Sequence, residues 1–476
     1  MQNIINITIL CILLFLSVAV LVLRVVRVTN RPIWDDGFTY IRTARQIAES
    51  RAWPDTLDFY CVSNRQGDRF TLPPLLMFLL VPFHKMDYKH FSNIPYLLDI
   101  LIALSIFFFS QILLSTTVWQ AAAGSFVYLL SPIIAFTQTK LTPRQLGSLF
   151  LLLFASFFSL YHQRGDTYFL ILCIFCVCLL LLSQRMATQV LFIGAPFTGA
   201  FLYIITPKLG LYFFICILAG ILLAFILTGG RYGIVIHDHF LRILQHARYG
   251  DQSTFRKKFG NPIQVVKANP WVIYLAFLVM IHGFSVTHIT VPVGYLVTAM
   301  LLSILWVFGN SVNHVYFTSP FAALLLSQYL LKDYFETFFM LAIALCCFYM
   351  IYREYTAISK QHINEQWLEC FDSIRKKNLN GYILVLPSIA CPPLVYYTDL
   401  RLISAGHGSQ AMEFNRIFLR ENCSDPEFVR KFANEAGVSY ILLHKERMQW
   451  TEIISQKNEF PTLFENELLR LLVVVH

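Results

Sequence analysis

Two adjacent aspartates, Asp35 and Asp36, directly follow the first apolar run and begin a predicted amphipathic helix. Two like charges side by side repel, so the pKa of one carboxyl group is expected to rise, which suits a general base. Arg42 and Arg45 follow on one face of this helix, with Glu49 four residues further on. Paired guanidinium groups at a membrane surface are suited to bind phosphate. These residue types predict proton abstraction beside an anion-binding site.

Each of these residues also has a structural explanation. Acidic side chains are favoured at helix N-termini, where they cap free N–H groups and interact favourably with the helix dipole. The two arginines also fit an ordinary solvated stripe or one that faces lipid headgroups. The residues alone leave both explanations open.

The composition predicts that the rest of the chain is a membrane scaffold. Of 476 residues, 57% are hydrophobic and 14% are charged, whereas a typical soluble domain has about 25% charged residues. Apolar runs near the length needed to cross a bilayer predict about 11 transmembrane helices. These runs lie at about 4–23, 93–114, 118–136, 147–162, 167–183, 189–206, 209–228, 271–289, 291–309, 315–331 and 335–352. We therefore expect a mainly α, polytopic membrane protein.

Two domains are predicted from the change in composition along the chain. Residues 1–352 form a transmembrane domain whose long first loop, 24–92, carries the acidic pair. Residues 353–476 are more polar, and short apolar strands alternate there with helical stretches, which predicts a small soluble α/β domain. The first apolar run has no basic residues before it and is long enough to span, so we expect a retained span rather than a cleavable signal peptide.

Charge gives conflicting information on orientation. The net charge is +9; no basic stretch has the interleaved aromatic residues of a nucleic-acid platform, so membrane lipids are the expected partners. An odd number of spans places the first loop and the tail on one side. Arg24, Arg27 and Arg31, together with the basic loop 229–270, favour the cytoplasm for both loops. Composition does not resolve this orientation.

The segment 35–48, an acidic pair followed by aromatic residues and Arg-Thr-Ala-Arg, resembles the first-loop signature of GT-C glycosyltransferases. These integral-membrane enzymes use polyprenyl-phosphate sugars, and they include protein O-mannosyltransferases and the aminoarabinose transferases that modify lipid A. Five further segments resemble elements of the class in the same order along the chain. They are Leu72–Leu75, Ser131–Leu149, Ile205–Lys208, Asn313–Pro320 and Val395–Arg401.

Three departures from the class are visible. The second acidic motif is missing, because Thr142-Pro143-Arg144-Gln145 stands where the class has an acid after Thr. His314 stands where Lys or Arg is common, so a phosphate contact there would depend on pH. The Trp-Trp-Asp motif of oligosaccharyltransferases does not occur, which argues against transfer of a whole glycan to Asn.

The resemblance implies an inverting transfer of one sugar from a polyprenyl-phosphate donor to a lipid, glycan or protein acceptor. Asp36 is the expected general base, and Asp35 orients it or the acceptor. The expected donor-binding residues are Arg42, Arg45, Lys140, Arg144, Lys208, His314 and Tyr316. No resident cofactor and no set of metal ligands are predicted, although a divalent metal ion is left open. Lys140, Arg144 and Lys208 flank spans, where anchoring is the commoner role of a cation, and the rings of His314 and Tyr316 fit the water–lipid interface.

The resemblance also implies that the first loop and the tail lie on the side of the membrane that faces away from the cytoplasm. The expected membrane is a bacterial inner membrane, with the endoplasmic reticulum as the alternative. Two alternatives stay open. A lipid-linked-sugar flippase or transporter would use ionisable residues within spans, such as Asp99, His282 and His288. A catalytically inactive GT-C-like scaffold protein is compatible with the missing second acid.

Overall fold

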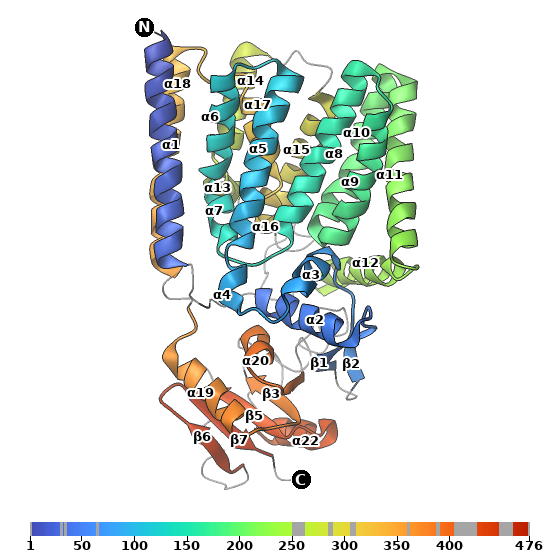
Figure 1. Ribbon diagram of the computed structural model, residues 1–476, viewed down its shortest axis with the longest axis vertical. Coiled ribbons are helices and arrows are strands. Elements are labelled where there is room, and N and C mark those ends of the chain that lie inside the picture. Colours follow the sequence, from blue (N-terminus) through green and yellow to red (C-terminus); the bar gives the residue numbers. More distant parts are fainter. Residues whose placement is uncertain are drawn as a thin grey trace. The chain divides into compact units, whose positions relative to one another are not determined.

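The computed structural model describes residues 2–28, 32, 36–62, 66–249, 262–283, 289–304, 311–358, 362–386, 391–403, 426–446 and 460–474. The chain divides into two compact units (Figure 1). The membrane unit comprises residues 1–29, 91–233 and 246–360, and the sheet unit comprises residues 30–90, 234–245 and 361–476. The first loop and the tail are thus grouped in one unit. The predicted domain boundary after residue 352 stays a prediction.

The membrane unit consists of helices, whose long members lie side by side in Figure 1. Its helices are α1 (Gln2–Arg27), α5 (Ile94–Leu114), α6 (Val118–Leu129), α7 (Pro132–Gln138), α8 (Arg144–Arg164), α9 (Tyr168–Ser183), α10 (Arg185–Ile205), α11 (Pro207–Leu227), α13 (Pro262–Ala268), α14 (Trp271–His282), α15 (Thr290–Ile304), α16 (Ser311–Val315), α17 (Thr318–Leu326) and α18 (Tyr334–Ile358). Helix α12 (Tyr232–Tyr249) contributes residues 234–245 to the sheet unit.

Each predicted apolar run overlaps a helix of this unit, so the polytopic helical fold is confirmed. Among the described residues, 6 helices are long and apolar enough to cross a membrane. The helices α6 and α7 pass the same test only when they are taken together, and they are bent by 58° where Pro132 begins the second helix. The helices α9, α14 and α15 are apolar but shorter. The count of eleven spans stays a prediction.

Helix α11 has one apolar face that is exposed and one that packs on a neighbouring helix. Leu218, Leu222 and Ile226 recur every four residues and are 65%, 62% and 65% exposed, as expected for a face in contact with lipid. The opposite face packs on α9. A Cβ atom on Gly220 would lie 2.5 Å from Cγ1 of Val177, so a glycine is needed for the two helices to approach this closely.

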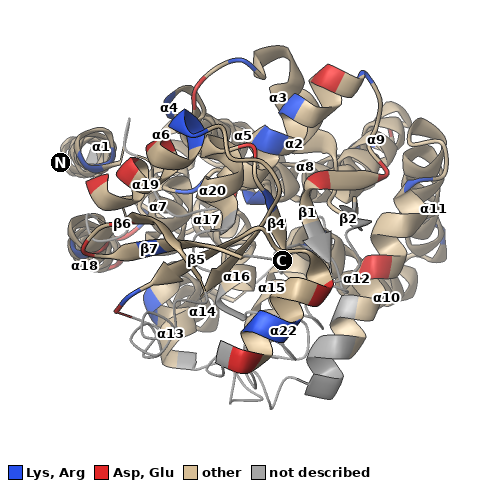
Figure 2. Ribbon diagram, turned by 90° about the horizontal axis from the view of Figure 1, so that it is seen from below, with Lys and Arg blue, Asp and Glu red and all other residues tan. Residues whose placement is uncertain are grey.

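The sheet unit is an α/β structure, which confirms the predicted fold class of the soluble part. Its helices are α2 (Gly37–Ser50), α3 (Leu75–Leu80), a 3-10 turn (Val81–Phe83), α4 (Tyr88–Phe91), α19 (Glu365–Lys376), α20 (Cys391–Tyr397) and α22 (Pro426–Ala436). Its strands are β1 (Thr56–Val62), β2 (Gln66–Arg69), β3 (Tyr382–Leu386), β4 (Arg401–Ile403), β5 (Tyr440–His444), β6 (Thr462–Glu465) and β7 (Leu469–Val473). Charged residues gather on α2, α19 and α22, as Figure 2 shows.

One seven-stranded sheet joins the first loop to the tail, in the order β2-β1-β4-β3-β5-β7-β6. Strand β1 of the loop runs parallel to β4 of the tail, with Tyr60 opposite Leu402. The core of the tail lies where Val429 and Ala433 of α22 pack with Leu384 and Leu443 of the sheet.

This strand pairing restricts the membrane topology. Strands of one sheet lie in one compartment, so the first loop and the tail lie on the same side of the membrane. The chain between β2 and α19 therefore crosses the bilayer an even number of times. The ten apolar runs predicted between these two elements satisfy this requirement.

Candidate active site

The turn that carries Asp36 is fixed by its backbone and not by its side chain. The carbonyl of Asp36 accepts hydrogen bonds from the N–H groups of Thr39, at 3.0 Å, and Tyr40, at 3.3 Å. The Asp36 carboxylate makes no capping hydrogen bond and is exposed. Helix capping therefore does not account for this acid, and its carboxylate is available for chemistry. Its predicted companion Asp35 lies outside the described residues.

Helix α2 is held in place by burial of one face. Phe38, Ile41 and Ala44 recur every three residues and are fully buried. The hydroxyl of Thr39 lies 2.7 Å from the phenol oxygen of Tyr60 on β1, which links the first turn of the helix to the sheet. The position of Asp36, directly before this turn, therefore depends on burial of this helix face and on the contact of Thr39 with Tyr60.

The two predicted arginines of α2 have different surroundings. The guanidinium carbon of Arg42 lies 5.9 Å from the centre of the Phe59 ring, and its Nε is buried without a hydrogen-bond partner among the described residues. Nε of Arg45 donates to the carbonyl of His84 at 3.1 Å, and its guanidinium carbon lies 4.5 Å from the centre of the Tyr396 ring. Arg45 thus links α2 to Tyr396 of the tail. Arg42 has a buried N–H donor that makes no hydrogen bond among the described residues. Binding of phosphate by either residue stays a prediction.

The other predicted cations lie in the membrane unit at or beside helix ends. Lys140 lies between α7 and α8, and its Nζ is 4.8 Å from the centre of the Phe136 ring. Arg144 is the first residue of α8 and is half-buried. Lys208 is exposed in the first turn of α11, 5.6 Å from the centre of the Tyr212 ring. The positions of Lys140 and Arg144 suit both anchoring and anion binding. Lys208 lies at the opposite end of the membrane unit, because the three helices α8, α9 and α10 separate it from Arg144 (Figure 1).

His314 and Tyr316 are both fully buried in the membrane unit, which does not fit rings that lie at the water–lipid interface. Nε2 of His314 lies 2.8 Å from Oε1 of Gln189. The Tyr316 hydroxyl donates to Oδ1 of Asp99 at 2.6 Å. The sequence indicated His314 and Tyr316 but gave no signal for Gln189, because its partner lies 125 residues away.

Asp99 is the centre of a buried polar cluster that the sequence did not predict. The Tyr128 hydroxyl also donates to its Oδ1 at 2.6 Å, and the two phenol oxygens lie 3.3 Å apart. Asp99 is therefore bound to α6 and to the turn between α16 and α17. The buried acid that suggested a transporter thus has structural partners. Of the other two candidates, His282 contacts Glu336 on α18, and His288 lies outside the described residues.

The segment without the expected second acid is also buried. The Thr142 hydroxyl donates to Oε1 of Gln145 at 3.3 Å, and both residues are nearly inaccessible. Among the described residues, no group of three His, Cys, Asp or Glu side chains is close enough to hold a metal ion.

The predicted site residues are divided between the two units. Asp36, Arg42 and Arg45 belong to the sheet unit. The residues of the membrane unit are Lys140, Arg144, Lys208, His314 and Tyr316.

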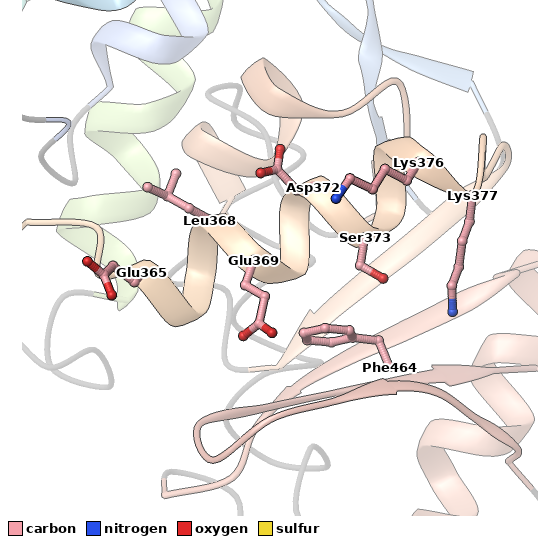
Figure 3. Close-up of a pocket in the computed structure, with 8 residues that line it drawn as sticks. All are labelled: Glu365, Leu368, Glu369, Asp372, Ser373, Lys376, Lys377 and Phe464. Atoms are coloured by element: carbon pink, nitrogen blue, oxygen red, sulfur yellow. The ribbon is translucent and has the colours of Figure 1, made fainter.

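A separate open pocket of about 540 Å³ lies between α19 and β6 (Figure 3). Glu369 and Ser373 lie on the face of α19 that is turned toward Phe464, and Lys377 directly follows the helix. Nζ of Lys377 donates to the carbonyl of Leu463 at 2.7 Å, and Oε2 of Glu369 accepts from Asn466 at 3.3 Å. These polar groups attach α19 to the β6–β7 hairpin, and none of the predicted site residues lines this pocket.

No family model matches the sequence, and no curated protein matches it. Solved structures do match its fold. The oligosaccharyltransferase AglB from Archaeoglobus fulgidus, in complex with an inhibitory peptide and a dolichol-phosphate, is 13% identical, with a TM-score of 0.63 over 96% of this chain and 72% of that chain. ArnT from Cupriavidus metallidurans, bound to undecaprenyl phosphate, is 11% identical, with a TM-score of 0.59 over 97% of this chain and 98% of that chain.

The fold follows from these matches. The chain has the GT-C fold of integral-membrane glycosyltransferases, as the segment 35–48 predicted. At this identity the likeness shows the fold alone.

Proposed function

We propose that this protein is a membrane glycosyltransferase that moves a sugar from a polyprenyl-phosphate donor to a hydroxyl group of an extracytoplasmic acceptor. The observation that carries the proposal is the common fold with ArnT, which covers nearly the whole of both chains and was solved with undecaprenyl phosphate bound. The exposed Asp36 carboxylate, which makes no capping hydrogen bond, supplies a base.

The proposed step is a single displacement with inversion. The acceptor oxygen forms a bond to the anomeric carbon while the bond from that carbon to the phosphate oxygen breaks on the opposite face. The proton of the acceptor hydroxyl passes to Asp36. The bonding electron pair leaves with the polyprenyl phosphate, whose growing negative charge is stabilised by cationic side chains.

The remaining residues are proposed to act as follows. Asp35 orients the base or the acceptor, Arg42 contacts phosphate through its guanidinium group, and Arg45 holds α2 through its contacts with His84 and Tyr396. The residues proposed to contact the donor from the membrane unit are Lys140, Arg144, His314 and Tyr316. Lys208 is not among them, because the three helices α8, α9 and α10 place it at the opposite end of the membrane unit from Arg144. Because phosphate on a polyprenol is already a good leaving group, the donor needs no nucleotide. Assays with added Mg²⁺ or Mn²⁺ and with EDTA would determine whether a divalent metal ion takes part.

A comparison of cells with and without the protein tests the function. We expect loss of the protein to leave a lipid-linked sugar unused and to remove one sugar from a surface glycan, lipid or protein. If the protein were a transporter, its loss would instead leave the lipid-linked sugar confined to the cytoplasmic leaflet. A scaffold protein would restore the modification even when it carries Asp36→Asn. Either outcome would overturn the proposal.

The proposed location is a bacterial inner membrane with the sheet unit in the periplasm, and it predicts a labelling pattern. Ala52→Cys places an exposed thiol just after α2, and Glu435→Cys places another on α22. In variants that lack other accessible cysteines, we expect both thiols to react with membrane-impermeant maleimides in intact spheroplasts. Reaction of both only after lysis would place the sheet unit in the cytoplasm. Reaction of one thiol alone would contradict the shared sheet.

A further inference from the structure

Tyr396 in α20 contacts the first loop through its hydroxyl and its ring. Its hydroxyl donates to Oδ1 of Asp87 at 2.8 Å and accepts the backbone N–H of Tyr88 at 2.9 Å. The Arg45 guanidinium carbon lies 4.5 Å from the centre of its ring, and the Phe38 ring centre lies 5.1 Å away. All of these residues belong to the sheet unit.

The two ring contacts lie at different points of α2. Phe38 and Arg45 are seven residues apart, which is roughly 10 Å along an α-helix. A rigid helix touched at two such points is fixed in both position and rotation. The rings of Phe38 and Tyr88 stack with their centres 4.2 Å apart, so the hydroxyl contacts of Tyr396 hold the residue that packs on Phe38.

The protonation state of Tyr396 suits this arrangement. Burial raises the pKa of the Tyr396 phenol most, and the hydrogen bond to Asp87 raises it further. The phenol therefore keeps its proton at physiological pH. It donates a charge-assisted hydrogen bond to the Asp87 carboxylate. Its ring keeps the neutral π-face that attracts the Arg45 guanidinium.

Asp36 lies two residues before Phe38, at the end of α2 that Tyr396 helps to fix. We propose that Tyr396 is a positioning residue, through which the tail sets the place of the catalytic base Asp36; this inference rests on the proposed function. The tail thereby contributes to the rate of transfer without touching the substrate. A displacement of a reacting group by about 1 Å can lower a rate by about 100-fold.

Kinetics of purified variants test this role. Tyr396→Phe removes the hydroxyl and keeps the ring, and we expect it to lower kcat for sugar transfer by about 10-fold, with KM for the donor unchanged. Tyr396→Ala removes the ring as well and is expected to lower kcat by about 100-fold. Tyr440→Phe on β5 removes a phenol hydroxyl from the same unit and is expected to keep the kcat of the wild type.

A double-mutant cycle separates positioning from loss of folded protein. Misfolding would lower the residual transfer rate of Asp36→Asn by the same factor as the wild-type rate. Positioning through Asp36 predicts instead that Tyr396→Phe has little effect in the Asp36→Asn background. Equal factors in the two backgrounds, or full activity of Tyr396→Phe, would overturn the inference. Absence of transfer by the wild-type protein would overturn the proposed function instead.

Discussion

Replacement of Asp36 by Asn is expected to lower the rate of sugar transfer by between about 10²-fold and 10⁴-fold, the usual contribution of a general base. The amide has nearly the same shape as the carboxylate but cannot take the acceptor proton. Because the Asp36 side chain is exposed and makes no capping hydrogen bond, we expect the stability of the variant to equal that of the wild type. The measurement is transfer from a purified polyprenyl-phosphate sugar, at matched amounts of monodisperse protein.

Glu49→Gln is the matched control for this variant. It removes one negative charge from an exposed position on the same helix and leaves the turn at Asp36 unchanged. We expect this control to retain wild-type activity, and Asp36→Glu to retain part of it because a carboxylate is still present. Full activity of Asp36→Asn would remove Asp36 from the mechanism, while the GT-C fold would still stand.

Replacement of Asp99 by Leu is expected to give the largest loss of stability. Both Tyr128 and Tyr316 donate to Oδ1 of Asp99, and all three residues are fully buried. Leucine leaves these two donors without their acceptor, and each such group costs about 1–3 kcal/mol. The two hydroxyls lie 3.3 Å apart and can bond to each other, so the expected loss is at the lower end, about 1–3 kcal/mol in all. A lower midpoint of thermal unfolding in detergent would measure it.

Asp99→Asn separates the acceptor role from other effects of the acid. The asparagine Oδ1 still accepts from both hydroxyls, so we expect a smaller change in the unfolding midpoint than for Asp99→Leu. Asp166→Asn, at an exposed position before α9, controls for loss of a negative charge in the same unit. Equal midpoints for Asp99→Leu and the wild type would show that the cluster does not hold α5, α6 and the α16–α17 turn together.

The class of fold was predictable because its signals are local. Hydropathy depends only on neighbouring residues, and each apolar run indeed overlaps a helix. The alternation of strands and helices in the tail is a local pattern of the same kind. The segment 35–48 carries the acidic turn and its helix within fourteen consecutive residues, so the GT-C resemblance could be recognised there.

Contacts between distant residues were decided by the tertiary structure alone. Strand β1 is too short to predict its partner, and the pairing of Tyr60 with Leu402 joins segments at opposite ends of the chain. The same holds for Arg45 on Tyr396, and for Tyr316, which lies 217 residues from its acceptor Asp99. Nothing local to either residue specifies such a partner, because the energy of the contact depends on burial that the whole fold creates. The sequence by itself therefore determined the membrane helices and the acidic turn, and only folding decided what holds that turn in place.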